Sequence, residues 1–326
     1  MKRRTGTGRT ASDDPGHTPH EVIHRAGPTA LRRYAPTTSS DAVPLLVVYA
    51  IFNRPWILDL GPDRSVVETF VASGRPTFVL DWGRPTALDG HLGLADYVGR
   101  YLREAVDAVA RSTGHEAVDL LGYSTGGTLA ACLAGARPGR VRSLALVASP
   151  IGFDVDDHRL ADLRDGAVPD GLVRRGRMAP GPLVAGALAS VDPVHFLLGR
   201  YLELAAAPTP TRLARLAWSA DPVDVPGTLQ ADLLELARDD ALIGGEATLG
   251  GDRVDLERLE APVATAVGAR DRLVPAASTE AVHHAAGGPG HRFVAPTDHL
   301  GLVSEPVAFE TLWPQFASWY DRLGAA

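Results

Sequence analysis

Short apolar runs alternate along the chain with longer segments in which apolar residues recur every three or four positions. Runs that are apolar on both faces are typical of strands in a parallel sheet, and the longer segments are typical of the helices that cover such a sheet. We predict strands at Leu45–Ala50, Thr77–Asp81, Val118–Gly122, Leu144–Ala148, Val263–Gly268 and Arg292–Ala295, and helices at Val66–Ser73, Leu94–Arg111, Gly126–Ala136, Thr279–Ala286 and Ala308–Leu323.

The alternation of strands and helices stops between Asp154 and Leu259. This stretch is rich in Ala, Leu, Arg and Pro, and it contains helix-like pieces at Thr211–Trp218 and Leu229–Ala237. An insertion at this place in an α/β fold commonly covers the strand ends where ligands bind. We therefore predict an α/β-hydrolase fold, with a mostly parallel central sheet flanked by helices and a helical cap, or lid, inserted into it.

The predicted domain organisation is a core made of residues 19–153 and 260–326, with the cap at 154–259. Residues 1–18 are polar and rich in Gly, Thr, Ser and Asp, which is typical of a disordered tail. Their basic start is followed by no apolar stretch, so we do not expect a secretory signal. The apolar run at 44–52 is far below the roughly 20 residues of a membrane span.

Composition narrows the functional class further. Lys and Arg number 32 and Asp and Glu 39, so the net charge is 32 − 39 = −7, which offers no overall attraction to nucleic acid. The single cysteine, Cys132, excludes an intramolecular disulfide and fits a cytoplasmic protein. The histidines are scattered without the spacing of metal ligands, so we expect no metal. We also expect no bound cofactor.

The strongest chemical signal is the sequence GYSTGG at residues 122–127. It follows an apolar strand and opens the helical run after Ser124. A G-x-S-x-G motif at a strand-to-helix turn is a nucleophile elbow, in which small neighbours permit strained backbone angles and the serine hydroxyl projects from the sheet edge. A chance occurrence would leave Ser124 idle in a glycine-rich turn. The strand before it and the helix after it favour the nucleophile.

Two partners follow in the order that this fold requires, an acid and then a histidine. Asp271 lies at the end of a predicted strand, and His299 follows the last strand. We predict that His299 is the general base for Ser124 and that Asp271 orients the imidazole and stabilises its charged form.

Other candidates for these roles are weaker. We expect Asp298 at the surface or capping a turn, because neighbouring loop residues rarely point at one another. His158 and His195 belong to the predicted cap, where they either line the cap or have no role. Surface placement is also the better interpretation for three histidines in or near a predicted helix, namely His283, His284 and His291.

The oxyanion hole requires two backbone N–H groups. One should come from Thr125, directly after the nucleophile, and the other from the loop after the first central strand, at Phe52 or Asn53. Cys132 lies inside the following helix and is more simply a buried filler than a second nucleophile. The basic cluster Arg174, Arg175 and Arg177 is either a contact for the phosphates of a thioester substrate or, more simply, a solvated face.

Several motifs carry more specific information than the serine motif. Residues 44–85 contain NRP after the first predicted strand, a DL…DRS stretch, and DWG after the next strand. Together with 218–263, 270–279 and 298–303, they resemble the poly(3-hydroxyalkanoate) synthases, most closely the short class III catalytic subunits. The resemblance covers roughly residues 40–322, whereas a generic esterase would share only the elbow, the acid and the base.

Three positions depart from the family pattern. The family's nucleophile is a cysteine in a G-x-C-x-G-G motif, and Ser124 stands in its place here. The family's acid is usually followed by histidine and its catalytic histidine preceded by glycine, where this chain has Arg272 and Asp298. An acyl-cysteine is an activated thioester, whereas an acyl-serine is an oxyester with little driving force for transfer to an alcohol.

The resemblance implies an acyltransferase. It would move a 3-hydroxyacyl-type group from a coenzyme A or carrier-protein (phosphopantetheine) thioester, through acyl-Ser124, to a hydroxyl acceptor. It also implies a homodimer and a helical companion subunit. One alternative is a serine esterase or thioesterase with water as the acceptor. Another is a catalytically silent binding subunit, against which the intact order of Ser124, Asp271 and His299 argues.

Overall fold

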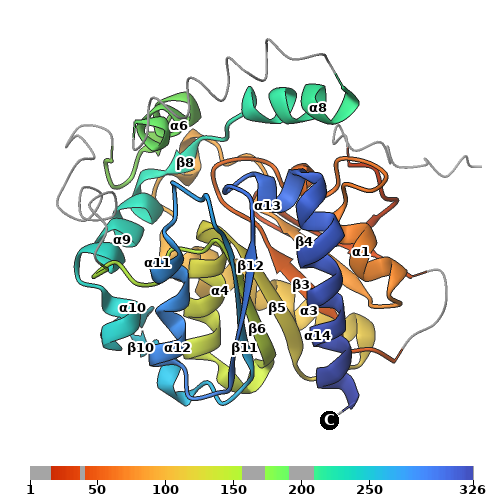
Figure 1. Cartoon of the computed structure of the whole chain (residues 1–326). Coiled ribbons are helices and arrows are strands. Elements are labelled where there is room, and N and C mark those ends of the chain that lie inside the picture. The colour runs from red at the N-terminus through yellow and green to blue at the C-terminus, as the bar shows by residue number, and fades with distance from the viewer. Residues whose placement is uncertain (1–15, 37–40, 156–172, 191–208, 326) are drawn as a thin grey trace, which may run out of the picture.

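A mostly parallel sheet of eight strands forms the centre of the molecule (Figure 1). The structure is a computed structural model that describes residues 16–36, 41–155, 173–190 and 209–325. In spatial order the strands are β1 (Glu21–Ala26), β2 (Thr29–Tyr34), β4 (Thr77–Asp81), β3 (Leu45–Val48), β5 (Val118–Tyr123), β6 (Val141–Val147), β11 (Val263–Gly268) and β12 (Gly290–Ala295). Strand β2 is antiparallel to both of its neighbours, and all other pairs are parallel. The predicted fold class is confirmed.

Helices cover both faces of this sheet. In β3, Leu45 and Val47 belong to one apolar cluster and Leu46 and Val48 to the other, as the two-residue period of a strand requires. Helices α1 and α14 complete the first cluster, and α3 and α4 complete the second. The helices packed on the sheet are α1 (Val66–Ala72), α2 (Leu94–Asp96), α3 (Arg103–Thr113), α4 (Thr125–Ala136), α11 (Ala276–Glu280), α12 (Val282–Ala285), α13 (Gly301–Ser304) and α14 (Trp313–Ala325).

Two of the predicted helices contain a π-helical turn. The segment predicted as one helix at 94–111 runs through α2, a π-helical stretch at Tyr97–Leu102 and α3, and the last helix begins with another at Ala308–Leu312. A π-turn admits an extra residue into the helical ladder. Apolar spacing does not reveal such a turn, because the buried face is resumed afterwards.

The first two strands were not predicted from the sequence. Strand β1 is the exposed edge of the sheet, and its residues show no clear apolar alternation. Strand β2 is almost wholly buried although it contains two arginines. Arg32 is 4% exposed because its guanidinium pairs with Asp81 at 2.5 Å on the neighbouring strand β4. Burial of this arginine depends on a partner about fifty positions away, which a local pattern does not show.

The described parts of the predicted cap form short helices and two-residue strand pairs. In Figure 1, α6 and α8 lie above one end of the sheet. Residues 156–172 and 191–208 of this segment, which include His158 and His195, fall outside the described residues. The elements are α6 (Gly181–Ala189), α8 (Pro210–Ser219), α9 (Gly227–Arg238), α10 (Ala241–Gly244), β7 (Met178–Ala179), β8 (Val225–Pro226), β9 (Thr248–Leu249) and β10 (Asp252–Arg253).

The predicted tail lies mostly outside the described residues as well. At its end, the His17 N–H donates to the Asp59 carbonyl at 3.1 Å, and the Thr18 N–H donates to Asp59 Oδ2 at 2.6 Å. No helix in the described ranges combines the length and the apolar character that crossing a membrane requires.

A buried carboxylate anchors the amino-terminal end of the sheet. Asp119 in β5 is fully buried and accepts hydrogen bonds from Arg75 at 2.8 Å, Arg142 at 2.6 and 2.8 Å, and Ser143 at 2.6 Å. Arg142 also donates to the Leu323 carbonyl in α14 at 3.1 Å. The cluster therefore joins β5 and β6 to the last helix.

Replacing this carboxylate should destabilise the protein strongly. We predict that Asp119→Asn lowers the free energy of unfolding by about 3–5 kcal/mol, because it leaves the buried guanidinium of Arg75 and the partly buried one of Arg142 without their anion. Urea denaturation measures the change. Asp321→Asn is the matched control, because the Asp321 carboxylate lies 3.7 Å from Arg75 but is 61% exposed; its effect should stay below about 1 kcal/mol. Equal losses in the two variants would contradict the prediction.

Candidate active site

Ser124 occupies a sharp turn between β5 and α4. Its φ of 54° and ψ of −133° lie in a region that side-chain-bearing residues rarely adopt. The Ser124 N–H still donates to the Val147 carbonyl in β6 at 2.9 Å, so the turn begins as a continuation of the sheet. The serine side chain therefore leaves the sheet at the carboxyl end of its central strand, as a nucleophile elbow requires.

The glycines around Ser124 are needed because backbone segments approach one another closely here. A Cβ on Gly122 would lie 2.2 Å from Gly127 Cα, and a Cβ on Gly126 would lie 2.2 Å from the Val48 carbonyl oxygen. A Cβ on Gly127 would lie 1.9 Å from Ser149 Oγ. Real Cβ atoms do not approach other atoms so closely, so only glycine permits the contact of α4 with β3 and β5.

The three predicted triad residues come together at this edge of the sheet. His299 Nε2 lies 3.1 Å from Ser124 Oγ, and His299 Nδ1 lies 2.8 Å from Asp271 Oδ2. Ser124 and His299 are each 8% exposed, and Asp271 is 9% exposed. The other oxygen of Asp271 accepts the N–H groups of Leu273 and Val274 at 2.8 and 2.9 Å. Two backbone donors thus hold the carboxylate that faces the imidazole.

Tyr123, the residue before Ser124, contacts His299. Its hydroxyl donates to the His299 carbonyl at 3.0 Å, and its ring stacks on Tyr49 with 5.7 Å between centroids and 8° between planes. Burial raises the pKa of both phenols well above their usual range, so Tyr123 remains a donor. Sequence reasoning missed this contact, since a tyrosine before the nucleophile gives no sign of its partner.

The predicted oxyanion-hole groups lie around the same turn. Thr125 is the first residue of α4, and its hydroxyl accepts the Ile51 N–H from the loop after β3 at 3.4 Å. The predicted second donors, Phe52 and Asn53, follow in this loop. Neither of their N–H groups donates to an acceptor among the described residues. Backbone donors beside a nucleophile suit the negative charge of a tetrahedral intermediate.

A buried ion cluster lies next to this loop. Asp81 is 2% exposed, and its carboxylate accepts hydrogen bonds from Arg54 Nη2 at 2.7 Å and from Arg32 Nη2 at 2.5 Å. Burial alone would raise the pKa of Asp81, but the two guanidinium groups outweigh it and hold that pKa below its usual range. Arg54 and Asp81 belong to the NRP and DWG motifs. The structure thus shows these motifs as partners.

The weaker candidates fall elsewhere. Asp298 caps the next turn, as predicted, by accepting the Gly301 N–H at 2.7 Å. His284 and His291 are exposed as predicted, but the prediction for His283 was wrong. It is half-buried, because its Nε2 lies 2.9 Å from the Thr265 hydroxyl in β11.

Cys132 is fully buried, and burial raises its thiol pKa to about 12, so it remains a neutral filler as predicted. Arg175 pairs with Asp232 at 2.6 Å and with Glu235 at 2.7 Å on α9. These pairs favour the solvated-face interpretation of the basic cluster. Within the described ranges, no group of three metal-ligating side chains comes together.

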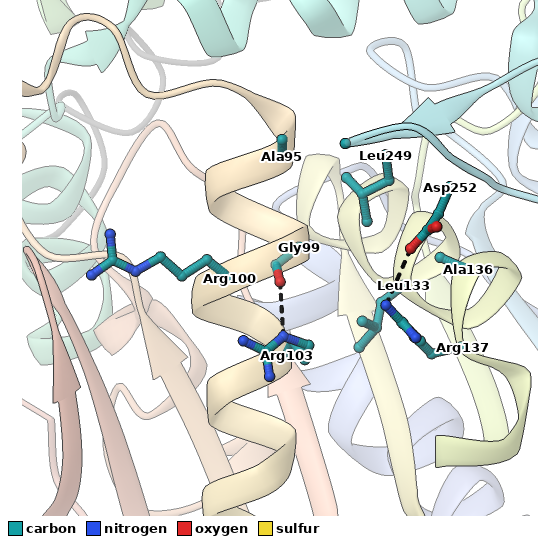
Figure 2. Close-up of a pocket in the computed structure, with 10 residues that line it drawn as sticks. Ala95, Gly99, Arg100, Arg103, Leu133, Ala136, Arg137, Leu249 and Asp252 are labelled. Carbon is teal, nitrogen blue, oxygen red and sulfur yellow. Dashed lines mark hydrogen bonds and ion pairs between the residues drawn. The ribbon is translucent and has the colours of Figure 1, made fainter.

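One pocket lies away from the triad, between the helix of α3, the end of α4 and the β9–β10 hairpin (Figure 2). Arg103 there donates to the Gly99 carbonyl at 2.9 Å, and Arg137 pairs with Asp252 at 3.1 Å. Arg137 follows the last residue of α4, whereas Ser124 precedes the first. The pocket is therefore separate from the candidate active site.

Comparisons with known proteins identify the family of the chain. A family model described as alpha/beta hydrolase fold matches residues 44–306. The poly(3-hydroxyalkanoate) polymerase subunit PhaC of Haloferax mediterranei is 33% identical over 94% of this chain, which spans 64% of that protein. The subunits of the same name from Haloarcula marismortui and Allochromatium vinosum are 31% and 28% identical over 95% of this chain, which spans 69% and 90% of them.

The chain belongs to the α/β hydrolase fold family and, within it, to the poly(3-hydroxyalkanoate) polymerase family. Solved structures agree in fold alone. A putative lipase from Sulfolobus solfataricus has a TM-score of 0.57 at 12% identity, covering 93% of this chain and 99% of that one. A thioesterase domain from the curacin biosynthetic pathway has a TM-score of 0.51 at 14% identity, covering 94% and 99%.

The elbow should not tolerate a side chain at Gly126. We predict that Gly126→Ala lowers the free energy of unfolding by roughly 1–3 kcal/mol and abolishes labelling of Ser124 by a fluorophosphonate, because α4 must move off β3. Denaturation and mass spectrometry measure the two effects. In the control Gly139→Ala, the new Cβ has no neighbour within 4 Å; stability and labelling should be unchanged. Full labelling of the Gly126 variant would show that the close contact is dispensable.

His283 should make the protein sensitive to acid. Burial, reinforced by the charge of Arg292, lowers the pKa of His283 to about 4, against about 6.5 in an unfolded chain. The unfolded state binds more protons between these values, so this stability is complete above pH 6.5 and is lost as the pH falls to 4. We predict that the free energy of unfolding falls less between pH 7 and pH 4.5 in His283→Gln than in the exposed control His284→Gln. Denaturation at the two pH values measures both changes. Equal losses would exclude His283 as the cause.

Proposed function

We propose that the protein is an acyltransferase that uses Ser124 as nucleophile, His299 as general base and Asp271 as the acid that orients it. The observation that carries the proposal is the hydrogen-bonded chain Asp271–His299–Ser124 at a strained elbow. Membership in the polymerase family favours transfer of a 3-hydroxyacyl group over other acyl chemistry. The substrate would be a coenzyme A or carrier-protein thioester, with no bound cofactor required.

The proposed reaction has two halves. His299 removes the Ser124 proton as the oxygen attacks the thioester carbonyl, and backbone N–H groups at Thr125 and in the 52–53 loop stabilise the resulting oxyanion. The C–S bond then breaks, and the imidazolium returns its proton to the departing thiolate. In the second half His299 deprotonates a hydroxyl acceptor, which attacks the acyl carbon. The C–O bond to Ser124 breaks, and the serine recovers its proton.

The serine nucleophile changes the energetics relative to cysteine. Loading from a thioester to an oxyester is downhill, but transfer from acyl-Ser124 to another alcohol has little driving force, and water competes for the acyl group. The low exposure of Ser124 and His299 supports transfer, because it limits the access of water. The alternative acceptor is water itself, which would make the protein a serine esterase or thioesterase.

The partners belong to the same proposal. The family resemblance is the basis for proposing a homodimer and a helical companion subunit, and a single buried cysteine is compatible with a cytoplasmic enzyme. The acceptor is then a growing polyester chain or a small hydroxylated metabolite. Size-exclusion chromatography with light scattering would measure the oligomer directly.

Intact-mass detection of an acyl adduct tests the proposal. After mixing with 3-hydroxybutyryl-CoA, the wild-type protein should gain one acyl mass, and Ser124→Ala should gain none. Asp271→Asn should form the adduct at least about a hundredfold more slowly, because the imidazole loses its orienting carboxylate. An adduct on Ser124→Ala, or a wild-type rate in Asp271→Asn, would refute the respective assignment.

The products formed in the same mixture show whether an alcohol or water accepts the acyl group. With an added alcohol, ester should accumulate if the protein is a transferase, and free 3-hydroxy acid should accumulate if water is the acceptor. A wild-type protein that neither forms an adduct nor reacts with a fluorophosphonate would instead be a binding subunit. The control His284→Gln, which lies outside the site, should match the wild type in every measurement.

A further inference from the structure

The loop that would supply the second oxyanion-hole donor is held by the cap segment. Trp218, 8% exposed, donates its Nε1–H to the Arg54 carbonyl at 2.9 Å. Asn53 returns a side-chain hydrogen bond to the Trp218 carbonyl at 3.2 Å. The Val223 N–H donates to the Phe52 carbonyl at 2.8 Å. Three consecutive loop residues are thus bonded to residues 218–223, more than 160 positions away.

These bonds set the direction of the loop's own donors. In a trans peptide the C=O and N–H groups point in opposite directions, and the described residues contain no cis peptide bond. The bond from Val223 fixes the Phe52 carbonyl, so it also fixes the Asn53 N–H in the same peptide plane. The bond from Trp218 fixes the Arg54 carbonyl, two residues further along the loop. The loop cannot rotate its peptides without breaking contacts to the cap.

The other side of the loop is fixed by charge. The Arg54 guanidinium pairs with Asp81 through two nitrogens, at 2.7 and 3.2 Å. A second ion pair connects the end of β4 to the cap, because the carboxylate of Asp221 in the cap pairs with Arg84, which follows β4. The loop therefore lies between the end of β4 and the cap, and is bonded to both.

We propose that Trp218 and Asn53 are positioning residues, and that docking of segment 218–223 holds the oxyanion-hole loop in its working geometry. This inference rests on the proposed acyl-transfer function. Neither side chain has to touch the substrate. Because the oxyanion develops only as the nucleophile attacks, a displaced loop weakens binding of the transition state more than binding of the substrate.

The test compares Trp218→Phe, which keeps the aromatic packing but removes the Nε1–H, with Asn53→Leu, which removes the amide. With p-nitrophenyl acetate as the probe, kcat should fall about tenfold in each variant, with KM within about twofold of wild type. Complete loss of one oxyanion donor typically costs 10²–10³-fold, so a displaced donor should cost less. Affinity for a trifluoromethyl ketone, which forms a tetrahedral oxyanion adduct with the serine, should fall by the same factor as kcat/KM.

Two controls separate positioning from general damage. Arg175→Gln breaks two ion pairs in the same insertion but no bond to the loop, so its kcat should match the wild type. The double variant of Trp218→Phe and Asn53→Leu should lose much less than the product of the single losses, because both act through one loop.

The outcomes are distinct. The positioning role would be overturned if the wild type is active and both variants keep its kcat. It would also be overturned if kcat falls in the variants while their affinity for the ketone is unchanged. Either result leaves the proposed function intact. An equal loss in Arg175→Gln would also overturn it. If Trp218→Phe does not fold, Asn53→Leu decides the question. A wild-type protein that neither hydrolyses the ester nor forms a Ser124 adduct would overturn the proposed function, and this inference with it.

Discussion

The arrangement of the site depends on how closely α4 approaches the sheet at its first turn. Gly126 and Gly127 bring the helix backbone against β3 and β5, and Ser124 accepts an unfavourable backbone conformation as the cost of that approach. The same contact fixes the first N–H groups of α4 and places Thr125 beside the loop after β3. Ser124 and the Thr125 N–H therefore take their relative positions from this one packing constraint, whereas the loop after β3 is held in addition by its bonds to segment 218–223.

Two buried carboxylates, each bound by two guanidinium groups, lie at opposite ends of the two strands that flank β3. Asp81 lies at the carboxyl end of β4, beside the loop after β3, and Asp119 lies near the amino end of β5. Taking charges out of water is costly, so such clusters add little net stability compared with apolar residues of the same volume. These clusters instead fix the relative positions of the segments that they join, because an arginine that donates two hydrogen bonds to one carboxylate can do so in few orientations.

Much of the fold was predictable because its signals are local. The apolar strands, the elbow around Ser124 and the order of Asp271 and His299 are all visible in short windows of sequence. What escaped prediction depends on distant partners. Arg32 in strand β2 is buried because it meets Asp81, and Tyr123 and Trp218 donate to carbonyl groups far along the chain. The π-turns escaped because they leave the apolar face of their helices unchanged.

The Arg32–Asp81 pair bears on where the working unit of this protein begins. The match to the α/β hydrolase family model starts at residue 44, whereas Arg32 and both strands of the first hairpin precede it. A chain trimmed to residues 44–306 would leave the buried Asp81 carboxylate without Arg32, one of its two guanidinium partners, beside the loop after β3. The buried ion cluster therefore extends upstream of the stretch that the family model matches.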